Sequence, residues 1–138
     1  MLFRSSAFGD AIETVKDRLE VPVLKPNEAM FEEALRHGKR LGLLATFEAS
    51  IPSMQAELTD VALQSVCVPE AMAALQAGDG ARHDALLAAA AARLRGCDAI
   101  MLAQFSTARA RDAVVAVVRC PVLTSPDSAV LAMRKRLA

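Results

Sequence analysis

Short apolar runs alternate with segments of helical spacing along the chain, and this alternation restricts the fold more than any other feature. Residues 41–45 (LGLLA) are uniformly apolar, which is typical of a strand buried on both faces of a parallel sheet. Residues 63–68 (LQSVCV) are expected to be a second strand of this kind. The other expected strands are residues 21–24, 99–103 and 121–123, with residues 2–3 as the stump of one more.

Between these runs lie stretches with helical spacing or high helix propensity. They are residues 8–19, 28–37, 51–62, 69–77, 80–95, 107–118 and 128–137. Strands of this length that alternate with helices predict an α/β fold, in which helices cover both faces of a parallel sheet.

Length and composition indicate the number of domains and the general class of protein. A chain of 138 residues that is 54% hydrophobic can form one domain with a sizeable core, so residues 1–138 are expected to be a single α/β domain. The 16 basic residues balance the 16 acidic ones, so the chain has no general attraction to nucleic acid or to a membrane surface. No apolar run is long enough to span a bilayer, and no signal peptide is visible.

Several kinds of site lack support in the sequence. The glycines form neither a dinucleotide-binding nor a P-loop motif, so neither of these nucleotide sites is expected. His37 and His83 have no second ligand at metal spacing, so we expect surface histidines and no metal site. An odd count of unpaired cysteines indicates reduced thiols in a cytoplasmic protein. Cys97 and Cys120 precede strands and should be buried structural thiols. Cys67 lies near the carboxyl end of a strand, so it is the one thiol that could take part in chemistry, although packing in the core is the favoured role.

Small polar residues follow the carboxyl ends of the expected strands, where open α/β sheets bind ligands. Each of them has an alternative role as a helix N-cap, which accepts a hydrogen bond from a free N–H group. Taken together, they would suit a small carboxylate held by hydroxyl groups and helix N-termini. The candidates are Ser5, Ser6, Thr46, Ser50, Gln104, Ser106 and Thr124.

Motifs spread over the whole chain resemble the aspartate/glutamate/hydantoin racemase superfamily, which has arylmalonate decarboxylase and maleate isomerase relatives. The motifs are residues 2–9 (LFRSSAFG), 21–24 (VPVL), 27–30 (NEAM), 42–46 (GLLAT), 100–106 (IMLAQFS), 120–123 (CPVL) and 125–129 (SPDSA). The resemblance implies a flavodoxin-like half-domain, with residues 1–27 as the tail of a first half and residues 28–138 as the second half. It also implies chemistry without cofactor or metal, in which one cysteine on each face of the substrate moves the α-proton.

The two cysteine positions of that family are occupied by Ser5 and Gln104 in this chain. The resemblance assigns carboxylate binding to Ser6, Thr46, Ser50, Ser106 and Thr124. The expected function is therefore a racemase-like isomerase that acts on, or binds, a small carboxylic acid or a hydantoin-like molecule. The alternative is a vestigial homologue that binds a carboxylate without catalysis, because neither a hydroxyl nor an amide can replace a thiolate. A packing module without a ligand is the least favoured alternative.

A homodimer is also expected. By comparison with the family, the chain is expected to lack the strands that precede residue 2, which should leave a sheet edge or an apolar face exposed. Such surfaces are commonly covered by a second copy of the same chain.

Overall fold

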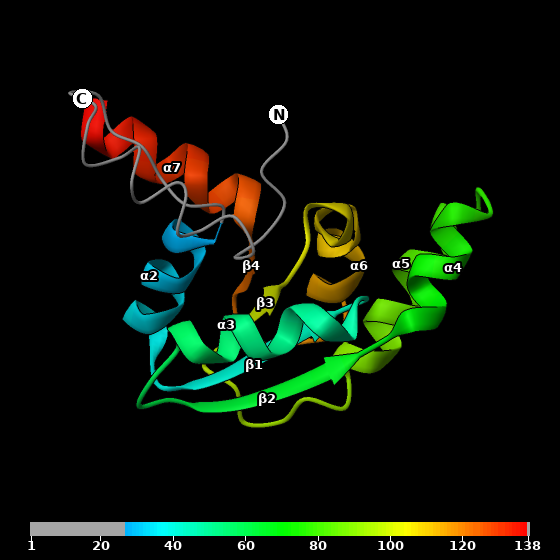
Figure 1. Ribbon diagram of the computed structural model, residues 1–138, viewed down its shortest axis with the longest axis horizontal. Helices are drawn as coiled ribbons and strands as arrows, with labels where there is room; N and C mark the ends of the chain where they lie inside the picture. Colours follow the sequence, from blue (N-terminus) through cyan, green and yellow to red (C-terminus); the bar gives the residue numbers. More distant parts are fainter. Residues whose placement is uncertain (1–26, 138) are drawn as a thin grey trace.

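The computed structural model describes residues 27–137, which form a four-stranded parallel sheet with helices on both faces (Figure 1). The strands are β1 (Arg40–Ala45), β2 (Ala62–Cys67), β3 (Ala99–Leu102) and β4 (Val122–Thr124), in the spatial order β2-β1-β3-β4. All three pairings are parallel. The predicted α/β class is confirmed, and the strand order matches the first four strands of a flavodoxin-like sheet.

Six α-helices and two 3₁₀ helices lie before, between and after the strands within the described residues. The α-helices are α2 (Glu28–His37), α3 (Ile51–Glu57), α4 (Pro69–Gln76), α5 (Gly80–Ala91), α6 (Arg111–Val115) and α7 (Ser125–Leu137). The 3₁₀ helices are η2 (Glu48–Ser50) and η3 (Phe105–Ala110). Figure 1 shows α7 leaving the end of β4 alongside α2, and the hydroxyl of Ser128 donates a hydrogen bond to the carboxylate of Glu33 at 2.8 Å.

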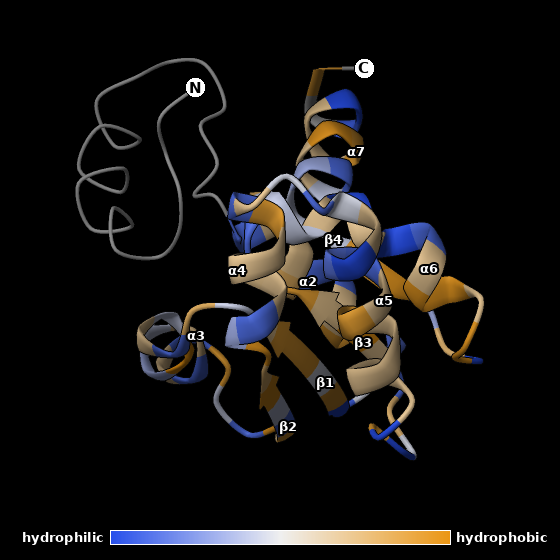
Figure 2. Ribbon diagram, turned by 90° about the vertical axis from the view of Figure 1, so that its right-hand side faces the viewer, coloured by the Kyte–Doolittle hydropathy of each residue, from blue (hydrophilic) through white to orange (hydrophobic). Residues whose placement is uncertain are grey.

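Side chains of β1 point alternately into two separate cores, and Figure 2 shows this strand as strongly hydrophobic. Leu41, Leu43 and Ala45 pack toward α2 and α3. Leu44 faces the opposite core with residues of α5 and α6. Burial on both faces explains why β1 is uniformly apolar in sequence.

Gly42 lies on the α5 side of β1, where the neighbouring side chains come very close. A Cβ atom at this position would lie 3.0 Å from Leu94 Cδ1, 3.1 Å from Ile100 Cγ1 and 3.2 Å from Cys97 Sγ. The absence of a side chain at Gly42 therefore lets these three side chains pack directly against the backbone of β1.

The prediction that residues 63–68 are buried on both faces is wrong. Within the described residues β2 pairs only with β1, so it stands at the edge of the sheet. Its residues are exposed or half-buried, and Gln64 is exposed and donates a hydrogen bond to the Arg95 carbonyl at 3.0 Å. The polar residues Gln64 and Ser65 in this run are consistent with an edge strand.

Helix boundaries differ from the predictions mainly at the carboxyl ends. The segment predicted as helix 51–62 ends at Glu57, and Asp60 then adopts a positive φ of 60°. The segment predicted as helix 107–118 begins earlier, at Phe105 as η3, and its α-helical part α6 ends at Val115. Helix α5 ends at Ala91 rather than at residue 95. The predicted elements at 2–3, 8–19 and 21–24 lie outside the described residues. Within residues 27–137, no helix has the length and apolar character needed to cross a bilayer.

Candidate functional site

Thr46 and Gln104 follow the carboxyl ends of the neighbouring strands β1 and β3. Pairing of the two strands continues to this point, because the Ala103 N–H donates to the Leu44 carbonyl at 2.9 Å. The side-chain oxygen of Gln104 accepts hydrogen bonds from the Thr46 N–H at 3.0 Å and from the Thr46 hydroxyl at 3.3 Å. Two of the predicted site residues are therefore joined directly.

Ser50 completes this arrangement from the end of η2. The Gln104 Nε2 atom donates to Ser50 Oγ at 2.7 Å, and the Ser50 hydroxyl in turn donates to the Phe47 carbonyl at 2.7 Å. We call Thr46, Ser50 and Gln104 the Gln104 network. Thr46 is 3% exposed and Ser50 is 9% exposed, so the network is largely shielded from solvent.

The backbone at Gln104 is held by Thr107, a fully buried residue that the sequence analysis did not single out. Its hydroxyl donates to the Gln104 carbonyl at 2.6 Å and lies 3.2 Å from the Gln104 N–H, which donates to it. The Gln104-x-x-Thr107 spacing at the start of a helical segment resembles a capping box, and this spacing was the signal that could have identified Thr107. The same contacts fix the direction in which the Gln104 side chain leaves the chain.

The remaining predicted residues have different surroundings. Thr124 is buried and caps α7, because its Oγ1 atom accepts a hydrogen bond from the Asp127 N–H at 3.2 Å. Ser106 is exposed at the start of η3 and takes no part in the Gln104 network. Ser5 and Ser6 lie outside the described residues.

Cys67 lies at the carboxyl end of β2 and is half-buried. Burial raises the pKa of its thiol above the ordinary value, and the carboxylates of Glu48 and Glu70 raise this pKa further. The thiol form therefore predominates at neutral pH, which disfavours Cys67 as a base.

His83 is fully buried on α5, so the prediction of a surface histidine is wrong for this residue. Its Nδ1 atom lies 2.7 Å from Asp84 Oδ1, and Asp84 also accepts a hydrogen bond from Arg109 Nε at 3.0 Å. His83 Nε2 has no hydrogen-bond partner. This cluster links α5 to η3, and His37, in contrast, is exposed as predicted.

Cys97 and Cys120 lie at the amino ends of β3 and β4, away from the Gln104 network. Both are half-buried and free, and burial raises the pKa of each thiol. Together they line a hollow of about 420 Å³. Their position at the opposite end of the sheet agrees with the prediction, although they are less buried than expected.

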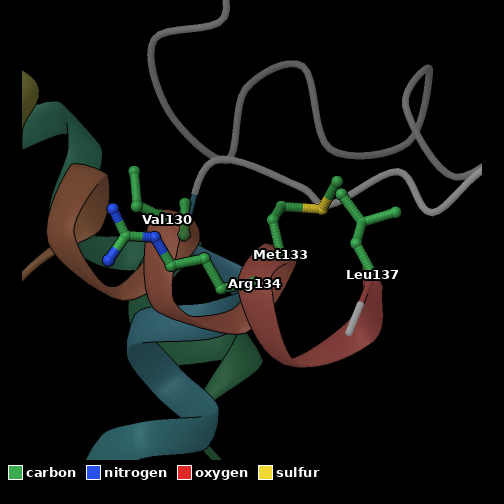
Figure 3. Close-up of a pocket in the computed structure, with 5 residues that line it drawn as sticks. Val130, Met133, Arg134 and Leu137 are labelled. Atoms are coloured by element: carbon green, nitrogen blue, oxygen red, sulfur yellow. The ribbon is translucent and has the colours of Figure 1, made fainter.

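A groove of about 610 Å³ adjoins the Gln104 network at Thr46. One wall is the loop after β1, and the other wall is α4. The lining residues are Thr46, Phe47, Glu48, Ala49, Pro69, Met72, Ala73 and Gln76. A separate apolar hollow of about 520 Å³ runs along α7, where Val130, Met133, Arg134 and Leu137 line it, and it contains no residue of the Gln104 network (Figure 3).

Comparison with known proteins gives no direct assignment. No protein-family model matches the chain, and no curated protein matches its sequence. In residues 27–137, no three His, Cys, Asp or Glu side chains come together as metal ligands. The arrangement that is described consists of neutral hydroxyl and amide groups beside a partly apolar groove.

Proposed function

We propose that this chain is a racemase-like protein that binds a small carboxylic acid at the carboxyl end of its sheet without exchanging the α-proton of the ligand. The observation that carries the proposal is the position of Gln104, which follows β3 and bonds to both Thr46 and Ser50. In parallel α/β sheets this edge is the usual place for ligands.

Proton transfer to or from carbon needs a group that titrates near the working pH. The Gln104 amide does not titrate, and its oxygen is occupied by Thr46. A serine hydroxyl such as that of Ser5 is far too weak an acid to serve in place of a thiolate. The raised pKa of Cys67 disfavours it as a substitute base.

Carboxylate binding needs hydrogen-bond donors rather than bases. Gln104 Nε2 carries two hydrogens, of which one is directed to Ser50 Oγ, so the other is available to a ligand. Ser106, which also follows β3, carries an exposed hydroxyl that is a second hydrogen-bond donor. These neutral donors fit the binding of a small anion better than they fit catalysis.

The second candidate function is an active racemase or isomerase, which the order of the resembling motifs favours. The two functions differ in solvent deuterium incorporation at the α-carbon of aspartate, glutamate and a hydantoin. We expect the natural chain to give no exchange above a buffer blank. Exchange well above the blank would overturn the non-catalytic proposal.

The matched control for that experiment is the double variant Ser5→Cys with Gln104→Cys, which returns thiols to both family positions. Its circular dichroism spectrum should first show that it folds. Exchange by the double variant alone would support the assignment of these two positions.

We also propose that the chain forms a homodimer. Two described surfaces support it: the outer edge of β2, which pairs with no described strand, and the apolar face of α7, where Val130 is 52% exposed and Leu137 is 68% exposed. Unpaired strand edges and contiguous apolar faces are commonly covered by a partner.

A further inference from the structure

We infer that the groove beside Thr46 is the subsite for an apolar, uncharged substituent of the ligand, so that the chain selects monocarboxylic acids over dicarboxylic acids. This inference rests on the proposed function, because it assumes that the ligand carboxylate is held near Gln104. To the proposed function it adds the chemical class of the ligand, an acid with one carboxylate and an apolar substituent.

Thr46 connects the groove to the Gln104 network. It lines the groove, and its N–H and hydroxyl both bond to Gln104 Oε1. Gln104 itself does not line the groove, so a ligand with its carboxylate at the second Nε2 hydrogen of Gln104 would have to extend past Thr46 to place its substituent there. A groove of about 610 Å³ is large enough for an aryl or branched alkyl group.

Apolar side chains form much of the groove surface. Phe47 is 55% exposed at one wall, and Pro69, Met72 and Ala73 lie on the α4 wall. An exposed aromatic ring and a half-buried methionine in the same groove give an apolar substituent a surface to cover. Each methylene group that becomes fully buried would strengthen binding about fourfold.

The charge near the groove is negative. Glu48 lines it, and the carboxylates of Glu48 and Glu70 are both close enough to raise the pKa of Cys67. No Lys or Arg is among the lining residues. A second carboxylate on the ligand would therefore meet repulsion from Glu48 with no cation to offset it, which at separations of about 6–8 Å weakens binding roughly three- to tenfold.

Hexanoate and adipate test this inference directly, because they have the same length and differ only in a terminal methyl or carboxylate group. Acetate tests the proposed function alone, because it has no substituent to place in the groove. Binding of all three to the full chain can be followed by calorimetry and by amide chemical shifts. We expect hexanoate to bind at least about tenfold more tightly than acetate, and adipate to bind more weakly than hexanoate.

Two variants locate the selectivity. Glu48→Gln removes the charge and keeps the shape, so the preference for hexanoate over adipate should shrink about three- to tenfold. Ala73→Trp fills the groove, so hexanoate should bind no better than acetate. Glu32→Gln, on α2 and outside the groove, removes a charge of the same kind and should leave the preference unchanged.

The outcomes separate the two proposals. If acetate binds but hexanoate binds no better, or if adipate binds as tightly as hexanoate, the inference about the groove is overturned and the proposed function stands. If no carboxylate binds, acetate included, the proposed function is overturned and the inference falls with it.

Discussion

The side-chain oxygen of Gln104 accepts hydrogen bonds from both the N–H and the hydroxyl of Thr46, at 3.0 and 3.3 Å. This relationship ties the loop after β1 to the loop after β3 at the edge where ligands bind in parallel sheets. Gln104 is therefore a structural residue whatever else it does. The first prediction follows from that role.

Replacement of Gln104 by leucine should destabilise the fold. Gln104→Leu leaves the Thr46 N–H and hydroxyl without their acceptor and Ser50 Oγ without its donor in a largely buried place, at a cost of about 2 kcal/mol in the free energy of unfolding. Thr46→Val removes only the hydroxyl bond and should cost about 1 kcal/mol or less. Urea denaturation measures both values. Equal costs for the two variants would contradict a central role for the Gln104 amide.

Thr124 should act mainly as a helix cap. Thr124→Val removes the acceptor of the Asp127 N–H and should lower the free energy of unfolding by about 1 kcal/mol. Thr124→Ser keeps the hydroxyl and should retain most of that stability. Thermal or urea unfolding compares the two variants. A loss of carboxylate binding with unchanged stability would instead favour the binding role that the sequence suggested.

An added methyl group at Gly42 should overfill the core on the α5 side of the sheet. Gly42→Ala places a Cβ atom 3.0 Å from Leu94 Cδ1, so we expect a loss of about 1–2 kcal/mol in the free energy of unfolding. The double variant Gly42→Ala with Leu94→Ala should lose less stability than the sum of the losses of the two single variants, because Leu94 is the side chain nearest to the added methyl group. A fully additive double variant would mean that the strain lies elsewhere.

The cluster of His83, Asp84 and Arg109 should make the free energy of unfolding depend on pH in the acidic range. Burial raises the pKa of Asp84, but hydrogen bonds from Arg109 and His83 outweigh it and hold this pKa below the ordinary value. The ionised carboxylate therefore stabilises the fold above its unfolded-state pKa of about 3.9, and this contribution is lost as pH falls through the lower folded-state value. The difference in unfolding free energy between the natural chain and Asp84→Asn should be largest near neutral pH and shrink below about pH 4. A difference that stays constant down to pH 2 would exclude this linkage.

The apolar face of α7 should contribute to self-association. Light scattering is expected to give a dimer for the natural chain, and Val130→Lys should shift it toward monomer by placing a charge on that face. Val117→Lys is the matched control, because Val117 is 49% exposed and does not line the α7 hollow. A monodisperse monomer at micromolar concentration would contradict the dimer. An unchanged dimer in Val130→Lys would exclude the face of α7 as the contact and favour the edge of β2.

The parts of the fold that the sequence predicted are those in which local composition and tertiary burial agree. Residues 41–45 are apolar because both faces of β1 are covered, and α2 was predicted with its observed boundaries of 28–37. The extent of β2 was also close, but its burial was wrong, because position in a sheet depends on the order of strands and not on one run of residues. The helix predicted over 51–62 was too long because the positive φ of Asp60 marks a turn that helix propensity does not reveal.

At the candidate site, the sequence predicted which residues lie at the carboxyl ends of the strands, but not which of them bond to one another. Gln104, Thr46 and Ser50 are brought together because β1 and β3 are neighbours, which is a property of topology. Thr124 was named by the same reasoning, yet its hydroxyl accepts from its own helix. The burial of His83 depends on how α5 packs, and no spacing in the sequence indicates it.

The Gln104 network also limits the order in which mutations at this edge can accumulate. A change of Gln104 to cysteine, taken alone, would remove the acceptor of the Thr46 N–H and the donor to Ser50 before any reactive thiol could be useful. The single mutant would then be less stable than its parent by about 1–3 kcal/mol, a large share of the stability of a small domain. Compensating changes at Thr46 or Ser50 would therefore ease an ancestral or laboratory path between an amide and a thiol at this position. Position 104 is in this sense epistatic to its two partners.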